Sequence, residues 1–166
     1  MWRSFSKRMS VTAAVASTAA LAVFPGAAGA ADPTFPAGVA CSFGLQVDAA
    51  GGDHRVERTF VDANGNPVRI LSAGRGSQLT FTNADTGATI ALRANGAVTS
   101  TVINADGSQT VTTTGHNVLI LFPSDVPAGP STTLYVGRVV YTVDADGVFT
   151  VVSTSGAATD ICAALS

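Results

Sequence analysis

Lysine, tryptophan and methionine are absent from the chain after residue 30, and charged residues make up only 12% of the whole sequence. The part after residue 30 keeps six arginines against eleven acidic residues, which gives a net charge of about −5. Binding to the phosphate backbone of nucleic acids, or to an anionic membrane surface, requires a positive patch. The composition therefore predicts no nucleic-acid partner. Because 46% of the residues are hydrophobic, disorder is not expected either.

Long apolar runs are also lacking, apart from one near the start. Val11 to Phe24 carries no charge, follows the basic Arg3, Lys7 and Arg8, and precedes the small residues Ala28-Gly29-Ala30. This order is typical of a secretory signal peptide, here residues 1–30, and the run is shorter than the ~20 residues that span a bilayer. A retained membrane anchor is the alternative. We expect a secreted, extracellular protein with no membrane insertion after signal cleavage.

Cysteine is scarce: Cys41 and Cys162 are the only two. In an exported chain they predict one intramolecular disulfide that joins the two ends of the domain. Closing the long loop between Cys41 and Cys162 stabilises the fold by about 4–5 kcal/mol. A metal pair or a reactive thiol is the alternative, but neither cysteine has a histidine or a second cysteine nearby. Gly38 stands where a lipidation signal needs a branched apolar residue, so lipidation of Cys41 is rejected.

Alternation of apolar and polar residues dominates from Cys41 onward, which predicts strands. The expected strands are Cys41–Val47, Val56–Val61, Val68–Leu71, those around Leu79–Phe81 and Ile90–Leu92, Val98–Ile103, Gln109–Thr114, Asn117–Phe122, Thr132–Val143 and Val148–Ser153. Gly137 suggests a β-bulge within the long strand. Residues 157–165 suggest one helical turn.

Turn signals separate these runs, notably Asn64-Gly65, Asp106-Gly107, Gly115-His116-Asn117 and Asp146-Gly147. They predict short hairpins, and Ser72 to Ser77 is likewise interpreted as a hairpin loop. The fold class is therefore all-β: an antiparallel meander of about 8–10 strands. A closed or nearly closed β-barrel is favoured over a β-sandwich, because closure brings the two ends together and removes exposed edges. The organisation is a signal peptide (1–30), an extended lead-in (31–40) and a single domain (41–166).

Catalytic and metal-binding patterns are weak. Asp144-Ala145-Asp146-Gly147 begins like a calcium loop but lacks its later oxygen ligands. No G-x-S-x-G motif is present, His54 and His116 both fall in expected loops, and no histidine pair has zinc-ligand spacing. The one glutamate after residue 30 is Glu57, which lies between arginines. A carboxylate pair for glycoside hydrolysis is therefore disfavoured. No catalytic residue, cofactor or metal is predicted.

Two features suit a binding role. The loop from Pro123 to Pro130 is stiffened by proline, which lowers the entropy cost of making contacts. Its candidate binding residues are Pro123, Asp125, Pro127 and Pro130. Tyr135, Val139 and Tyr141 share one strand face, which predicts either a core or a binding surface. Threonines on the neighbouring strands (Thr99, Thr101, Thr110, Thr112 and Thr114) are interpreted as solvent-facing.

The leader, the two cysteines near the ends and the segment Phe122–Pro130, followed by a long strand and an Asp-Gly turn, resemble uncharacterised small secreted proteins of high-GC Gram-positive bacteria (actinobacterial type). This resemblance implies no activity, so no site residue is carried over from it.

Export without catalytic motifs predicts a non-enzymatic binding module that engages an extracellular protein or a cell-envelope glycan. One alternative is a structural or adaptor subunit of a secreted assembly. Another is a β-barrel carrier of a small apolar ligand. A core filled by Phe43, Leu45, Phe81 and Leu121 without a cavity would argue against the carrier. An unrecognised hydrolase would require His54 or His116 to meet a carboxylate in a cleft.

Overall fold

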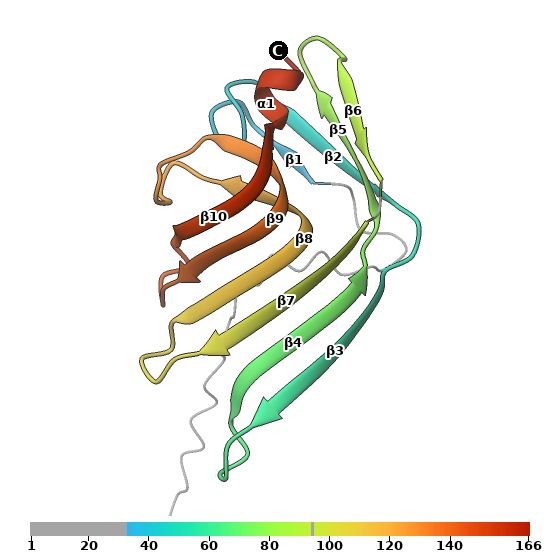
Figure 1. The fold of residues 1–166 in the computed structure, drawn as a ribbon. Coiled ribbons are helices and arrows are strands. Elements are labelled where there is room, and N and C mark those ends of the chain that lie inside the picture. Colours follow the sequence, from blue (N-terminus) through green and yellow to red (C-terminus); the bar gives the residue numbers. More distant parts are fainter. Residues whose placement is uncertain (1–32, 94) are drawn as a thin grey trace, which may run out of the picture.

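Two antiparallel β-sheets make up the structure, a computed structural model that describes residues 33–93 and 95–166 (Figure 1). The elements are β1 (Thr34–Phe35), β2 (Leu45–Ala50), β3 (His54–Val61), β4 (Pro67–Arg75), β5 (Gln78–Asn83), β6 (Thr89–Leu92), β7 (Gly96–Ile103), β8 (Gln109–Leu121), β9 (Ser131–Val143), β10 (Phe149–Asp160) and α1 (Ile161–Ala164). The predicted all-β class is confirmed. The predicted signal peptide lies outside the described residues.

The chain moves between the sheets rather than along one meander. The four-stranded sheet has the order β1-β2-β5-β6, and the six-stranded sheet has the order β10-β9-β8-β7-β4-β3. The chain enters the larger sheet as the β3–β4 hairpin, returns to the smaller sheet for β5 and β6, and then forms β7 to β10 as consecutive hairpins. The segment from Ser72 to Ser77 is therefore the end of β4 and a crossing between sheets, not a hairpin loop.

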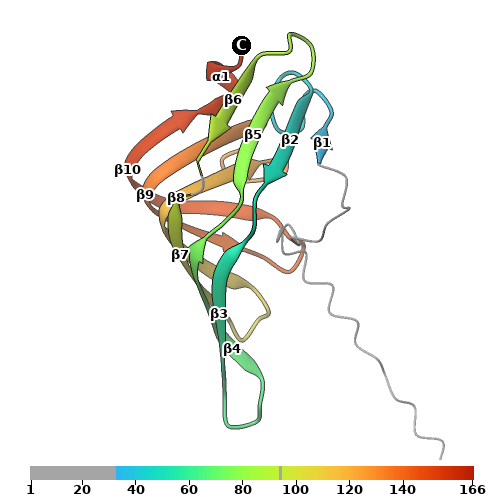
Figure 2. The same ribbon diagram turned by 90° about the vertical axis from the view of Figure 1, so that its right-hand side faces the viewer.

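The favoured closed barrel is not found in the described residues. The larger sheet curls strongly, but its end strands β3 and β10 do not pair with each other. Figure 2 shows the β3–β4 hairpin extending away from the rest of the molecule, and every residue of β3 is exposed. Three connections (β2 to β3, β4 to β5 and β6 to β7) cross between the two sheets, so the strands do not form the single closed sheet that a barrel requires.

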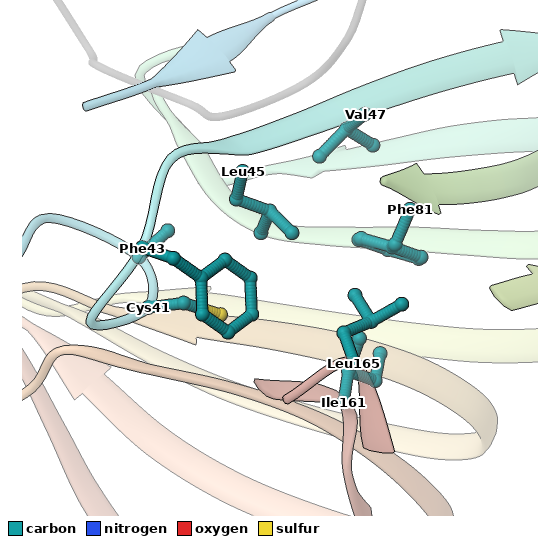
Figure 3. Close-up of a cluster of buried hydrophobic side chains, with 8 residues drawn as sticks. Cys41, Phe43, Leu45, Val47, Phe81, Ile161 and Leu165 are labelled. Atoms are coloured by element: carbon teal, nitrogen blue, oxygen red, sulfur yellow. The ribbon is translucent and has the colours of Figure 1, made fainter. Parts of the chain in front are cut away.

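The disulfide and the best-packed part of the core lie at the same end of the molecule. Cys41 and Cys162 are bonded with their Cα atoms 5.5 Å apart, which confirms the predicted link between the near-terminal segments. Ile161 and Leu165 from the α1 region pack beside Leu45 and Phe81, as Figure 3 shows. The expected core residues Phe43, Leu45, Phe81 and Leu121 are all buried. Ala40 and β1 join this end, so part of the predicted lead-in packs within the domain.

A row of glycines crosses the larger sheet at one register level. Gly74, Ala97, Gly115, Gly137 and Gly156 are successive partners on β4, β7, β8, β9 and β10, and we call the four glycines among them the glycine row. Gly115 has a φ of +99°, and a Cβ atom there would meet the carbonyl oxygen of Gly96. Only glycine adopts this conformation with a neighbouring backbone so close. The row bends the strands in concert and curls the sheet.

Two local predictions are wrong because of this row. Gly115-His116-Asn117 is not a turn, since β8 runs through it without a break from Gln109 to Leu121. Gly137 does not create a bulge, since its pairing with both neighbouring strands is continuous; the register shift lies between Val151 and Ser153 instead. A positive φ on several adjacent strands bends them together, so no residue is left unpaired.

Replacing Gly115 by alanine should lower the free energy of unfolding by at least about 3 kcal/mol, because it adds backbone strain and a steric clash with the neighbouring strand. Gly107→Ala is the matched control. Gly107 also has a positive φ, +85°, but a Cβ there would meet nothing within 4 Å. The control should cost only about 1–2 kcal/mol. Urea unfolding of both variants measures the difference. Equal losses of unfolding free energy would show that the close backbone packing at Gly115 does not contribute to stability.

The double variant Cys41→Ser/Cys162→Ser should lose about 4–5 kcal/mol of unfolding free energy, because the bridge spans a sequence separation of 121 residues. Urea unfolding measures the loss, and reduction of the wild-type protein should reproduce it. Coinciding unfolding curves for the oxidised protein and the double variant would refute the stabilising role.

A candidate ligand-binding cleft

A cleft of about 940 Å³ lies between the concave face of the larger sheet and the smaller sheet. Its wall takes residues from β4, β7, β8 and β9, together with Val47, Leu79 and Phe81 of the smaller sheet. This volume is at the upper end of the 300–1,000 Å³ typical of small-molecule sites. The buried core at the disulfide end thus leaves space elsewhere in the domain.

Aromatic residues gather on the wall of the cleft. Six of them line it: Phe35, Phe81, Phe122, Tyr135, Tyr141 and Phe149. Tyr141 and Phe149 are stacked, with ring centroids 5.4 Å apart and 26° between the planes. Phe35 and Phe122 form a second, tilted pair at 6.0 Å. The face predicted for Tyr135, Val139 and Tyr141 is therefore this wall.

The orientation of β7 is the reverse of what its residue types predict. Thr99 and Thr101 line the cleft, and Thr101 is only 8% exposed. Val98 and Val102 lie on the opposite face and are 44% and 42% exposed. A strand that only filled a core would turn its valines inward. The solvent-facing interpretation of Thr99 and Thr101 is wrong, because strand pairing on both sides fixes which face of β7 meets the cleft.

Hydroxyl groups form a row across the floor of the cleft. Ser72, Thr99 and Thr113 are direct partners on β4, β7 and β8, two residues along each strand from the glycine row. The Oγ1 atom of Thr113 is buried and has no hydrogen-bond partner among the described residues. Asn117 also lines the cleft, and its Nδ2 atom is likewise buried and has no hydrogen-bond partner among the described residues. Each such atom costs about 1–3 kcal/mol, so these are polar groups that a ligand or water can satisfy.

Charged residues on the cleft are confined to exposed positions. Arg55 and Asp53 form an ion pair at the start of β3. The hydrogen bond from the Arg55 side chain lowers the pKa of the Asp53 carboxyl, and the same bond raises the pKa of Arg55. The remaining charged lining residues, Arg93, Asp144 and Asp146, are also exposed. The inner wall is therefore uncharged.

Burial changes the acidity of one wall residue. Removal of the Tyr141 side chain from water raises the pKa of its phenol above the ordinary value. The phenol therefore stays protonated throughout the physiological pH range. It remains able to donate a hydrogen bond.

The predicted binding loop is anchored by one of its own residues. Asp125 is buried, and its carboxylate accepts hydrogen bonds from the backbone N–H groups of Phe122 (2.6 Å) and Phe149 (2.9 Å). Val126 pairs with Thr150 of β10 as an isolated parallel bridge. Asp125 thus positions the loop from a buried site, whereas Pro123, Pro127 and Pro130 are exposed.

The other polar residues considered from sequence are scattered. His54 and His116 are exposed, and in the described part of the chain neither imidazole bonds to a carboxylate. The Asp144 carboxylate accepts from the N–H groups of Asp146 and Val148 within its own turn. Within residues 33–93 and 95–166 there is no cluster of three metal-ligating side chains. The helix in this part of the chain is too short to span a bilayer.

No family model matches the chain, and comparison with curated proteins and with solved structures likewise gives no match. The functional argument therefore depends on the cleft itself.

Asp125→Ala should lower the free energy of unfolding by about 2–4 kcal/mol, because two buried backbone N–H groups lose their acceptor. The neighbouring exposed residue supplies the control: Ser124→Ala should change stability by less than about 0.5 kcal/mol. Urea unfolding tests both. If Asp125→Ala lowers the free energy of unfolding no more than Ser124→Ala does, the hydrogen bonds to Asp125 do not hold the loop.

Proposed function

We propose that this protein is a secreted, non-enzymatic binding protein that holds one small, largely apolar molecule in the cleft between its two sheets. The observation that carries the proposal is the inverted orientation of β7, which turns hydroxyls into the cleft and valines toward solvent. Departures from the expected hydrophobic pattern concentrate at functional sites, since a core gains nothing from them.

The cleft also has the composition of a small-molecule site. Such sites are mainly apolar and aromatic, with a few polar groups that orient the ligand. The aromatic wall and the hydroxyl row supply these two parts. A signal peptide and a disulfide suit an extracellular carrier, since the bridge keeps the domain folded where the medium is oxidising.

A second candidate is engagement of an extracellular protein or an envelope glycan through the Pro123–Pro130 loop. Its support is the exposure of Pro123, Pro127 and Pro130 on a loop that Asp125 anchors. In that case variants within the cleft would leave partner binding unchanged.

Titration with the neutral solvatochromic dye Nile red tests the cleft. We expect saturable binding with one dye per protein, because the apolar wall shields the dye from water. Thr99→Phe should weaken this binding at least about tenfold, since the larger side chain fills the cleft. The matched control is Val98→Phe on the outer face of the same strand, which should bind as the wild type does.

Absence of saturable dye binding would contradict the proposal, as would equal affinities for the two β7 variants. Native mass spectrometry of the protein purified after export then identifies any molecule it carries. A mass increment that is present in the wild type and in Val98→Phe but missing from Thr99→Phe would come from a ligand of the cleft.

A further inference from the structure

The chemistry of the wall narrows the class of ligand, an inference that rests on the proposed function. Tyr141 of β9 pairs directly with Val111, and Thr113 of β8 pairs with Val139. Tyr141 and Thr113 are therefore diagonal neighbours on the inner face, a relation that brings a long side chain within reach of the other residue. Two hydroxyl groups thus belong to one patch of the cleft wall.

Both hydroxyls are free to bind a ligand group. Among the described residues, the buried Oγ1 of Thr113 has no hydrogen-bond partner, and no hydrogen bond joins the phenol of Tyr141 to another residue. Because the pKa of Tyr141 is raised by burial, its O–H remains a donor. A pair of unused donors on one patch of the wall suits an acceptor oxygen of a ligand.

The same patch offers a flat apolar surface. The Tyr141 ring stacks on Phe149, and both rings line the cleft. Planar rings bind such platforms through offset stacking. The ionisable lining residues other than Tyr135, Tyr141 and His116 form the exposed charged set already described, and His116 is exposed as well. Each charged residue among the described lining residues is exposed to water, so none of them is buried where it could neutralise an ionised ligand, which favours a neutral one.

We infer that the cleft selects an uncharged ring compound bearing a carbonyl or similar acceptor oxygen, which stacks on the Tyr141–Phe149 platform and accepts hydrogen bonds from Tyr141 and Thr113. Tyr141 is the specificity-determining residue, because it contributes both the ring and the donor. Aromatic hydrocarbons bind the same cleft but accept no hydrogen bond from Tyr141, because they contain no oxygen.

Two neutral probes separate these contributions in the full-length exported protein. Nile red carries a ring carbonyl, whereas diphenylhexatriene has aromatic rings and no oxygen. Tyr141→Phe should weaken Nile red binding about tenfold, the effect of one lost hydrogen bond, and change diphenylhexatriene binding less than about twofold. The emission of bound Nile red should also shift to shorter wavelength, because its carbonyl loses a hydrogen bond.

Thr114→Val is the matched control, since Thr114 is exposed on the outer face of β8, next to Thr113 in the chain, and does not line the cleft. It should leave the affinities for both probes unchanged. Thr113→Val should weaken Nile red binding in the same direction as Tyr141→Phe without loss of stability, because the hydroxyl it removes is buried and unpaired.

The outcomes distinguish the two proposals. If neither probe binds the wild type, the carrier function itself is wrong. If both probes bind and Tyr141→Phe behaves like Thr114→Val, the carrier function stands and the donor role of Tyr141 is refuted. If Tyr141→Phe weakens both probes equally, the hydroxyl affects the cleft without donating to a ligand oxygen, which also refutes selection of an acceptor oxygen.

Discussion

The close approach of backbones along the glycine row is the constraint on which the rest of the structure depends. At Gly115 the backbone of β7 occupies the space that any Cβ would need, and φ is positive. Repeated on adjacent strands, this geometry bends the larger sheet without breaking a ladder. The bend makes one face concave, and the cleft lies on that face. Without the row, a twisted open sheet would pack flat against its neighbour as in a sandwich.

The core and the cleft divide the interior between them. The disulfide, α1 and the ends of β2 and β5 fill one end with close-packed side chains (Figure 3). The other part of the interior is left open between aromatic rings and hydroxyls. Because the covalent bridge and the buried cluster provide stability at one end, the domain tolerates unsatisfied polar atoms such as Thr113 Oγ1 at the other. Binding sites commonly carry such local costs.

The Pro123–Pro130 loop, which was predicted to bind a partner, also contacts an edge strand of the larger sheet. Asp125 holds its backbone against the start of β10, and Val126 covers part of that strand's outer edge. Covering a free edge reduces the risk of strand-to-strand aggregation. The edge at β3 has no such cover in the described residues, although Arg55, Glu57 and Arg58 place charges along it. Charged side chains are a second common protection of an edge.

Residue alternation and turn chemistry, which act over a few residues, were enough to determine the all-β class, most strand positions and the core residues Phe43, Leu45 and Phe81. The two cysteines likewise determined the disulfide. Tertiary structure alone decided that the strands divide between two sheets, because long-range pairing has no local signature. It also decided that Thr99 faces the cleft and Val98 faces water. A strand's inward face is set by its neighbours and by the bend at the glycine row, and these neighbours outweighed the strand's own hydrophobic pattern.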